Sequence, residues 1–430
     1  MAAVVEHQPE YESWFNIHET LAQPYYSVSL RDRFQIDNHK PPAPVENEPV
    51  KFADIDYDVD EVKFRALSKA RVAAGGLEAE VPPFWPKRVR GPLVWTPEKM
   101  TEDIYVVHLT DEDKAEILEA LAHFKEQDLD GSEVSRESFP LPTLSKKLDA
   151  MCTDVYEGHG FSVLRGLNPE VFSAEDVTVI YLGLASYIGE TRGKQDQRGS
   201  MIMHIIKLHD ARDKQYCADK PFHTDTVTDC ICLFAFGVSA RGGCSFVAPA
   251  WQVYNEIAAT RPDIIHVLSR PDWPFDTHGR DPAYIKRAVL YHHKGKIIFS
   301  FSRRLLVGHP PHDPRTLGIP GLTEAQAEAL DAVHFAAKKF EVRPTMQRGD
   351  LRFINNMGLL HCREAFEDDS NNARHLIRLW LHNELMCWKL PEPLRLAWAR
   401  VFEDEDRKEY FDIMPPKKDG VLLRVAGTSD

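Results

Sequence analysis

Short apolar segments separated by turn residues run through the second half of the sequence, and they limit the folds that this chain can adopt. The clearest are residues 230–237, 351–355 and 375–382, which have the length and composition of buried strands. Most segments with helical periodicity lie nearer the N-terminus. Strands and helices segregated in this way are typical of an α+β fold. The sequence therefore predicts an antiparallel double-stranded β-helix, or jelly-roll, core with helices packed against its outside.

Three hydroxyl-bearing residues mark positions where helices are expected to begin. Thr110, Ser173 and Thr323 each precede a segment with apolar residues at helical spacing, and each can accept a hydrogen bond from the first helical turn. A hairpin is expected further on, where residues 287–292 and 296–301 flank a Lys-Gly turn. These signals place helices and strands along the chain without fixing how the strands pair.

The N-terminal part of the chain differs from the rest. It has no strong hydrophobic period, and its prolines cluster in two places: Pro41, Pro42 and Pro44, then Pro82, Pro83 and Pro86. We expect residues 1–95 to form an extension that wraps the core. Residues 96–400 are then the double-stranded β-helix domain, and residues 401–430 are a C-terminal tail.

Composition narrows the range of partners. The formal net charge of −14 argues against general binding to nucleic acid or to anionic membranes. The sequence has no run of about 18 apolar residues, so no membrane span is predicted. Its first residues do not follow the pattern of a secretory signal peptide. Together with an odd number of cysteines, 7, this predicts reduced thiols and a cytoplasmic protein. The sequence leaves the oligomeric state open.

A His-x-Asp pair is the first candidate for chemistry. On an extended strand His223 and Asp225 point to one face, about 6.6 Å apart, so both can bind one metal ion. The pattern alone carries little weight, because 19 histidines and 66 acids give about three such pairs by chance. One other occurs, at residues 382–384. A facial triad needs a second histidine and leaves positions open for substrate, and His361, just after a predicted strand, is the candidate.

Two arginines follow His361 and give it a chemical context. Arg374 comes thirteen residues later and Arg378 four residues after that. Guanidinium groups bind carboxylates through paired, charge-assisted hydrogen bonds. The two Cα atoms are about 13 Å apart on one face of a strand, which suits two different anions. Without Arg374, His361 would be interpreted as a buried core histidine, and Arg378 has the alternative of a structural pair with a buried acid.

Together these features resemble the Fe(II)/2-oxoglutarate dioxygenases of the TauD/TfdA-like group, in the clavaminate synthase-like superfamily. The resemblance rests on His-Thr-Asp at 223–225, Gly-Gly-Cys-Ser at 242–245, and a distal histidine followed by Arg-x-x-x-Arg at 374–378. From about residue 96 onward the chain is also similar to fungal members of the group. The resemblance implies three ligands for the iron: His223, Asp225 and His361.

The resemblance also implies roles for three other residues. Arg374 matches the arginine that pairs with the C5 carboxylate of 2-oxoglutarate, and Ser245 stands where the family usually has a threonine hydroxyl on that carboxylate. Arg378 matches the position that binds the anionic group of the substrate in taurine- and amino-acid-oxidising members. The implied reaction uses O₂ and oxidises a C–H bond, by hydroxylation, desaturation or ring closure. The expected substrate is a small anion, such as an amino acid or a related carboxylate or sulfonate.

Two other interpretations use the same ligands. A zinc-dependent hydrolase could bind Zn²⁺ through two histidines and an aspartate and activate a water molecule. A jelly-roll binding protein could hold a metal ion without turnover. Arg374 argues against the hydrolase, because hydrolysis needs no second buried anion site at that place.

Overall fold

The computed structural model describes residues 28–35, 52–207, 213–225, 227–278, 282–418 and 421–422. The α-helices are α1 (Val28–Arg33), α2 (Glu61–Ala74), α3 (Glu102–Tyr105), α4 (Asp111–Glu126), α5 (Ser145–Tyr156), α6 (Ala174–Ser186), α7 (Asp213–Cys217), α8 (Ala250–Thr260), α9 (Pro262–Ser269), α10 (Arg303–Val307), α11 (Glu324–Lys339) and α12 (Arg395–Phe402). The 3₁₀ helices are η2 (Pro97–Lys99), η3 (Gly131–Glu133), η4 (Pro169–Val171) and η5 (Glu392–Leu394).

The strands are mostly short. They are β1 (Val106–His108), β2 (Phe161–Arg165), β3 (Thr191–Arg192), β4 (Met203–Ile206), β5 (Lys220–His223), β6 (Cys230–Gly237), β7 (Arg241–Gly242), β8 (Ser245–Pro249), β9 (Trp273–Asp276), β10 (Tyr284–Arg287), β11 (Leu290–His293), β12 (Lys296–Phe299), β13 (Leu351–Asn355), β14 (Leu359–Arg363), β15 (Phe366–Glu367), β16 (His375–His382), β17 (Lys417–Lys418) and β18 (Val421–Leu422). Among the helices of the described ranges, none is long and apolar enough to cross a membrane.

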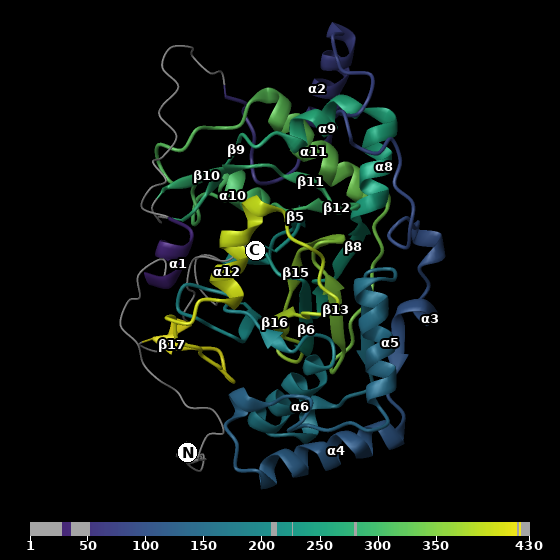
Figure 1. Cartoon of the computed structure of the whole chain (residues 1–430), viewed down its shortest axis with the longest axis vertical. Coiled ribbons are helices and arrows are strands. Elements are labelled where there is room, and N and C mark those ends of the chain that lie inside the picture. The colour runs from purple at the N-terminus through teal and green to yellow at the C-terminus, as the bar shows by residue number, and fades with distance from the viewer. Residues whose placement is uncertain are drawn as a thin grey trace.

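A seven-stranded sheet forms the centre of the molecule (Figure 1). Its strand order is β1-β2-β13-β6-β16-β3, and β4 also pairs with β16. Only β1 and β2 run parallel, and the other pairs in this sheet are antiparallel. The middle strands β13, β6 and β16 are therefore far apart in sequence and adjacent in space.

Both faces of this sheet are buried, because successive side chains of a strand point to opposite faces. In β6, Cys230, Cys232 and Phe234 pack with apolar residues of α4, α5 and α6. In Figure 1, α4 and α6 lie below the sheet and α5 lies beside it. The alternate residues Ile231 and Leu233 face a second core, shared with α8, α9 and α11. Burial on both faces explains why β6 is apolar along most of its length.

A smaller, three-stranded sheet lies on the side of this second core. Its order is β5-β14-β8, and both pairs are antiparallel. Phe222 of β5, Val247 of β8 and Leu360 of β14 belong to the same apolar cluster as Ile231 and Leu376 of the large sheet. The space between the two sheets is thus a packed interior, and the predicted metal ligands lie at its edge.

The helix-start signals are confirmed. Thr110, Ser173 and Thr323 are the residues that precede α4, α6 and α11, and each side chain accepts a hydrogen bond from the third helical N–H. At Thr110 and Thr323 a capping box is complete, because the side chain of the third helical residue also accepts from the backbone N–H of the capping residue.

Two expectations need correction. The hairpin is formed by β11 and β12 alone, and Arg287 belongs to β10, which pairs with β9. Helices are also less confined to the N-terminal part than the predicted segregation implies, because α8 and α9 lie in the second half of the chain together with α11, the helix expected after Thr323. They follow β8 or precede β13, and cover the core beside the small sheet. The apolar face of each helix can be recognised in the sequence, but the sequence does not show which part of the core that face packs against.

The described part of the N-terminal region packs on this core. Phe64 of α2 stacks against Phe335 of α11, with ring centroids 4.9 Å apart. Leu93 and Trp95 are members of the core cluster between the sheets. Residues 1–27 and 36–51, with Pro41, Pro42 and Pro44, lie outside the described ranges. The domain boundaries at 95 and 400 stay predictions.

Candidate metal centre and anion pocket

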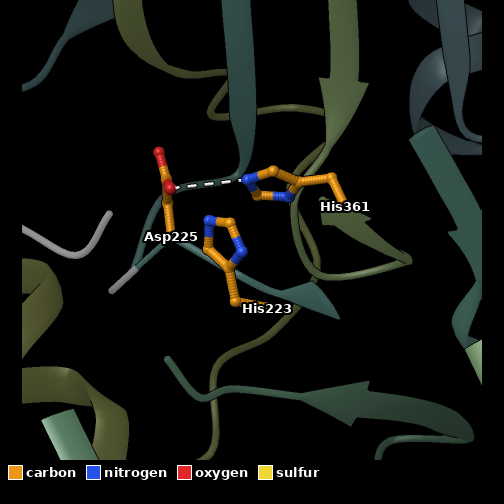
Figure 2. A group of neighbouring side chains, drawn as sticks. All are labelled: His223, Asp225 and His361. Carbon is orange, nitrogen blue, oxygen red and sulfur yellow. Dashed lines mark ion pairs between the residues drawn. The ribbon is translucent and has the colours of Figure 1, made fainter. Parts of the chain in front are cut away.

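The three predicted metal ligands converge at one point (Figure 2). His223 ends β5 and Asp225 follows it, while His361 lies in the middle of β14, opposite His223 in the strand register. Their imidazole rings are 4.3 Å apart between centroids. One possible ligand atom from each of the three residues lies within 4.8 Å of the others. Two histidines and one carboxylate at this spacing are the donor set that Fe(II) takes in non-haem oxygenases.

His223 is held in the form that can bind a metal. Its Nδ1 lies 2.8 Å from the carbonyl oxygen of Pro221, so Nδ1 donates and Nε2 keeps its lone pair. Burial, helped by the neighbouring His361, lowers the pKa of His223 to about 3. The ring is therefore neutral at physiological pH, as a metal ligand must be.

The carboxylate of Asp225 is oriented by two side chains of β16. Its Oδ2 accepts a hydrogen bond of 2.6 Å from Trp380 Nε1 and lies 3.0 Å from Arg378 Nη1. Its Oδ1 lies 3.6 Å from His361 Nε2. Metal-binding carboxylates are commonly oriented in this way: neighbouring side chains bond one oxygen, and the other oxygen can bind the metal.

The backbone around Asp225 is fixed by Asn356, which lies in the turn between β13 and β14. Asn356 Oδ1 accepts from the N–H of Asp225 at 2.8 Å, and its Nδ2 donates to the carbonyls of Asp225 and Thr228 at 3.2 and 3.1 Å. The N–H of Asn356 donates to the carbonyl of Asp229 at 2.9 Å. One buried amide thus ties the segment after Asp225 to the turn that leads to His361.

Arg378 forms an ion pair with a buried acid, which is the structural alternative that the sequence left open for this residue. Besides its pair with Asp225, its Nε donates to Gln195 Oε1 at 2.8 Å, and its guanidinium lies 5.0 Å from the ring centroid of Trp380. Gln195 is itself buried and donates to the carbonyl oxygen of Arg378. These contacts place Arg378 beside the predicted metal ligand, and its role toward a substrate stays a prediction.

Arg374 directly precedes β16, and the neighbouring acid Asp368 accepts a hydrogen bond from its backbone N–H, at 2.9 Å, and not from its guanidinium group. Its Nη1 is buried without a hydrogen-bond partner, and its Nε has only a long contact of 3.4 Å with the carbonyl of Gly243. Within the ranges that the structure describes, no acidic side chain forms an ion pair with it. Burial, with a smaller effect of Arg363, lowers the pKa of Arg374 to about 9, so it stays protonated at neutral pH. A buried guanidinium of this kind fits a carboxylate ligand.

Ser245 lies close in sequence to Gly243, whose carbonyl oxygen contacts Arg374. It begins β8, two residues after Gly243, and is paired in register with Arg363 of β14. The structure thus links the two predicted residues through Gly243, and their joint role toward a carboxylate stays a prediction. The other candidate pair, at residues 382–384, does not form one site with the predicted ligands. Its histidine, His382, forms a hydrogen bond with Asp229.

The sequence did not identify several residues that contact the predicted site. Trp380, Asn356 and Gln195 were not among the predicted site residues. The turn at Asn355-Asn356, directly between a strand and His361, was the one local signal for a residue that supports the site.

Comparisons with known proteins identify the class. The family described as "Taurine catabolism dioxygenase TauD, TfdA family" matches residues 106–380. The protein is an Fe(II)/2-oxoglutarate-dependent dioxygenase, which uses Fe(II), 2-oxoglutarate and O₂. Within that class, the chain belongs to the TauD/TfdA family.

Two curated relatives extend over most of the chain. The taurine hydroxylase-like protein SAT17 of Stachybotrys chartarum is 31% identical over 334 residues, which cover 74% of this chain and 86% of that protein. The FR-33289 synthase of Streptomyces rubellomurinus is 26% identical over 318 residues, or 69% of this chain and 91% of the synthase. A solved structure of asparagine oxygenase with Fe(II), 2S,3S-3-hydroxyasparagine and succinate has a similar fold, with a TM-score of 0.50 and 14% identity over 65% of this chain and 93% of that one.

Proposed function

We propose that His223, Asp225 and His361 bind the catalytic Fe(II). The proposal is supported by the convergence of their ligand atoms within 4.8 Å and by the chemistry of the donor set. Three protein ligands on one face leave the other positions to small molecules. When bound, the iron with 2-oxoglutarate and O₂ supplies the oxidising power, and the protein aims a substrate C–H bond and excludes water.

We further propose that Arg374 and Ser245 bind the C5 carboxylate of 2-oxoglutarate. The observation that carries this assignment is the buried guanidinium of Arg374, which has no acidic partner among the described residues. Leaving such a charge without a partner is costly, and a carboxylate ligand removes that cost. A zinc hydrolase would have no use for this cation, so the arginine favours the oxygenase over that alternative.

The two sheets support a proposal for the architecture. We infer that the seven-stranded and three-stranded sheets are the two sides of a double-stranded β-helix within residues 96–400. The support is that both sheets contribute to one apolar core and are almost entirely antiparallel. The metal site then lies at the edge of the small sheet, between the two layers.

The proposed substrate is a small anion, an amino acid or a related carboxylate or sulfonate. Arg374 and Arg378 are both buried and lie on the same face of the large sheet, so the interior beside the metal site is rich in positive charge. The relative named as taurine hydroxylase-like points to the same class, because taurine is an amino sulfonate. The proposed reaction is oxidation of one C–H bond, by hydroxylation, desaturation or ring closure.

A screen for succinate release tests this function. The chain with Fe(II), 2-oxoglutarate and O₂ should release succinate faster with one class of small molecules among amino acids, sulfonates and betaines. The His361→Ala protein, assayed in parallel, should show no stimulation. If no compound stimulates release and the wild-type background equals that of the variant, the alternative of a metal-binding protein without turnover is preferred.

The variant Arg378→Met distinguishes two roles of this arginine. Because Arg378 contacts the carboxylate of Asp225, we expect its loss to weaken Fe(II) affinity by about tenfold, as loss of such outer partners typically does. Anaerobic titration with Fe(II) at saturating 2-oxoglutarate measures this. Unchanged iron affinity with a raised KM for the organic substrate alone would instead assign Arg378 to substrate binding. Arg378→Lys, which keeps the charge, is the matched control.

A further inference from the structure

A second buried arginine, Arg352, points into the same interior as Arg374. It lies in β13, where Leu351 and Phe353 pack toward the helices α4 to α6, and Ile354 packs toward the core between the sheets. Arg352 therefore shares the inner face with Ile354. In the strand register it lies opposite Leu233 of β6, and Leu233 in turn lies opposite Arg378 of β16. The inner face of the sheet thus carries two guanidinium groups at this level, one from β13 and one from β16.

Arg352 has almost no partner for its charge. Only 1% of the residue is exposed, and its Nε and Nη2 are buried without hydrogen bonds. Its Nη1 has one contact, 3.5 Å from the carbonyl of Pro344. In the described part of the chain it forms no ion pair. The acid beside it in sequence, Asp350, is engaged by Arg165, whose Nη2 lies 2.9 Å from Oδ2.

The groups that surround Arg352 do not neutralise it. Cys244 and Tyr105 are the titratable neighbours besides Asp350, and burial raises the pKa of the Tyr105 phenol, so Tyr105 carries no charge at neutral pH. Burial lowers the pKa of Arg352 to about 10, so the guanidinium stays protonated. Arg352 is also close enough to Arg374 to lower the pKa of that residue. Two buried like charges are stabilised by an anion placed between them.

The segment at residues 243–245 connects the two arginines. Arg374 Nε faces the carbonyl of Gly243, and the thiol of Cys244 lies near Arg352. The next residue is Ser245, whose hydroxyl is the other proposed contact of 2-oxoglutarate. Arg352 therefore approaches the proposed carboxylate site from β13, while Arg374 approaches it from β16.

We propose that Arg352 is a second cationic residue of the 2-oxoglutarate site, and that it binds the C5 carboxylate together with Arg374. This inference rests on the proposed function of Arg374. A carboxylate placed between the two guanidinium groups relieves their mutual repulsion and supplies the partner that each lacks. It makes the site selective for 2-oxo acids with a distal carboxylate.

The test is the variant Arg352→Met, which keeps a long, unbranched apolar side chain and removes the guanidinium group with its charge. Calorimetric titration under anaerobic conditions with Fe(II) should show 2-oxoglutarate binding weakened by about tenfold or more. Binding of 2-oxovalerate, which has the same carbon chain without the C5 carboxylate, should change little. The ligand-free variant should melt at the same temperature as the wild type or higher, because an unpaired buried charge has been removed.

A matched control is Arg287→Met. Arg287 is also a buried arginine, but it has a protein partner, since its Nη1 donates to the carbonyl of Ser300 at 2.6 Å. Its loss should lower the melting temperature and leave the dissociation constant of 2-oxoglutarate unchanged. An Arg352→Met protein that behaves like this control would overturn the proposal and make Arg352 a structural residue.

Two further variants separate this proposal from the function on which it rests. If Arg374→Ala weakens 2-oxoglutarate binding and Arg352→Met does not, the 2-oxoglutarate site stands and the role of Arg352 is refuted. If neither variant weakens binding, the assignment of Arg374 fails as well. If the Arg352→Met protein does not fold, the Arg352→Lys variant decides whether Arg352 binds 2-oxoglutarate. It keeps the charge but not the paired donors, and an unchanged affinity for 2-oxoglutarate together with a lowered melting temperature would refute the proposal.

Discussion

Replacing His361 with alanine is expected to abolish the visible charge-transfer band that Fe(II) and 2-oxoglutarate produce together under anaerobic conditions. The reason is that His361 is one of the three proposed ligands, whose atoms lie within 4.8 Å of one another, and the two ligands that remain would hold the metal poorly. Loss of a partner outside the ligand set typically weakens metal binding by about 10- to 100-fold, so loss of a ligand should exceed that range. Succinate release should fall to background.

The control for this experiment is His382→Ala. His382 belongs to a second group of possible ligands with Asp229 and Cys387, and it is bonded to Asp229. If the iron binds where we propose, this variant keeps the band. A band that persists in His361→Ala and disappears in His382→Ala would move the centre to the second group.

Replacing Arg374 with alanine is expected to raise the dissociation constant of 2-oxoglutarate by about 10- to 100-fold. A hydrogen bond to a charged group contributes about 1.5–3 kcal/mol, and each 1.4 kcal/mol corresponds to about a factor of ten. At saturating 2-oxoglutarate the charge-transfer band should return, because the metal ligands are unchanged. Calorimetry and the band, measured on the same protein, separate loss of the cosubstrate from loss of iron.

Arg374→Lys completes the comparison. Lysine keeps the charge but lacks the planar pair of donors, so an intermediate affinity is expected. An affinity equal to that of the wild type in Arg374→Ala would assign the C5 carboxylate to another residue, and Arg352 would be the first to examine.

Local patterns predicted the elements that hold the site. The strands at 230–237, 351–355 and 375–382 were predicted with the bounds that β6, β13 and β16 have. Each is a central strand, buried on both faces, so its apolar run is unbroken and easy to recognise. The start of the hairpin was predicted less accurately. Arg287 is buried at the end of β10, and in the sequence it could not be distinguished from the first residue of the next strand.

The partners of the site residues could not be predicted in the same way. His223, Asp225 and His361 were found because their order resembles a known family, and the structure brings them together. The bond between Trp380 and Asp225 depends on how β16 aligns with β6 and on the path of the turn after β5. Those features arise from pairing across long stretches of chain, so they have no local signature.

The contact between Asn356 and the backbone of Asp225 also bears on when the metal centre can form. The two residues lie 131 positions apart in the chain. Contacts of such long separation form late in folding, because the intervening chain must first be ordered. During synthesis the segment with Asp225 leaves the ribosome before β13 and β14 have been made. If the iron binds where we propose, we expect it to enter a domain whose strands are already in place, and a chain that stops before β14 lacks the ligand His361.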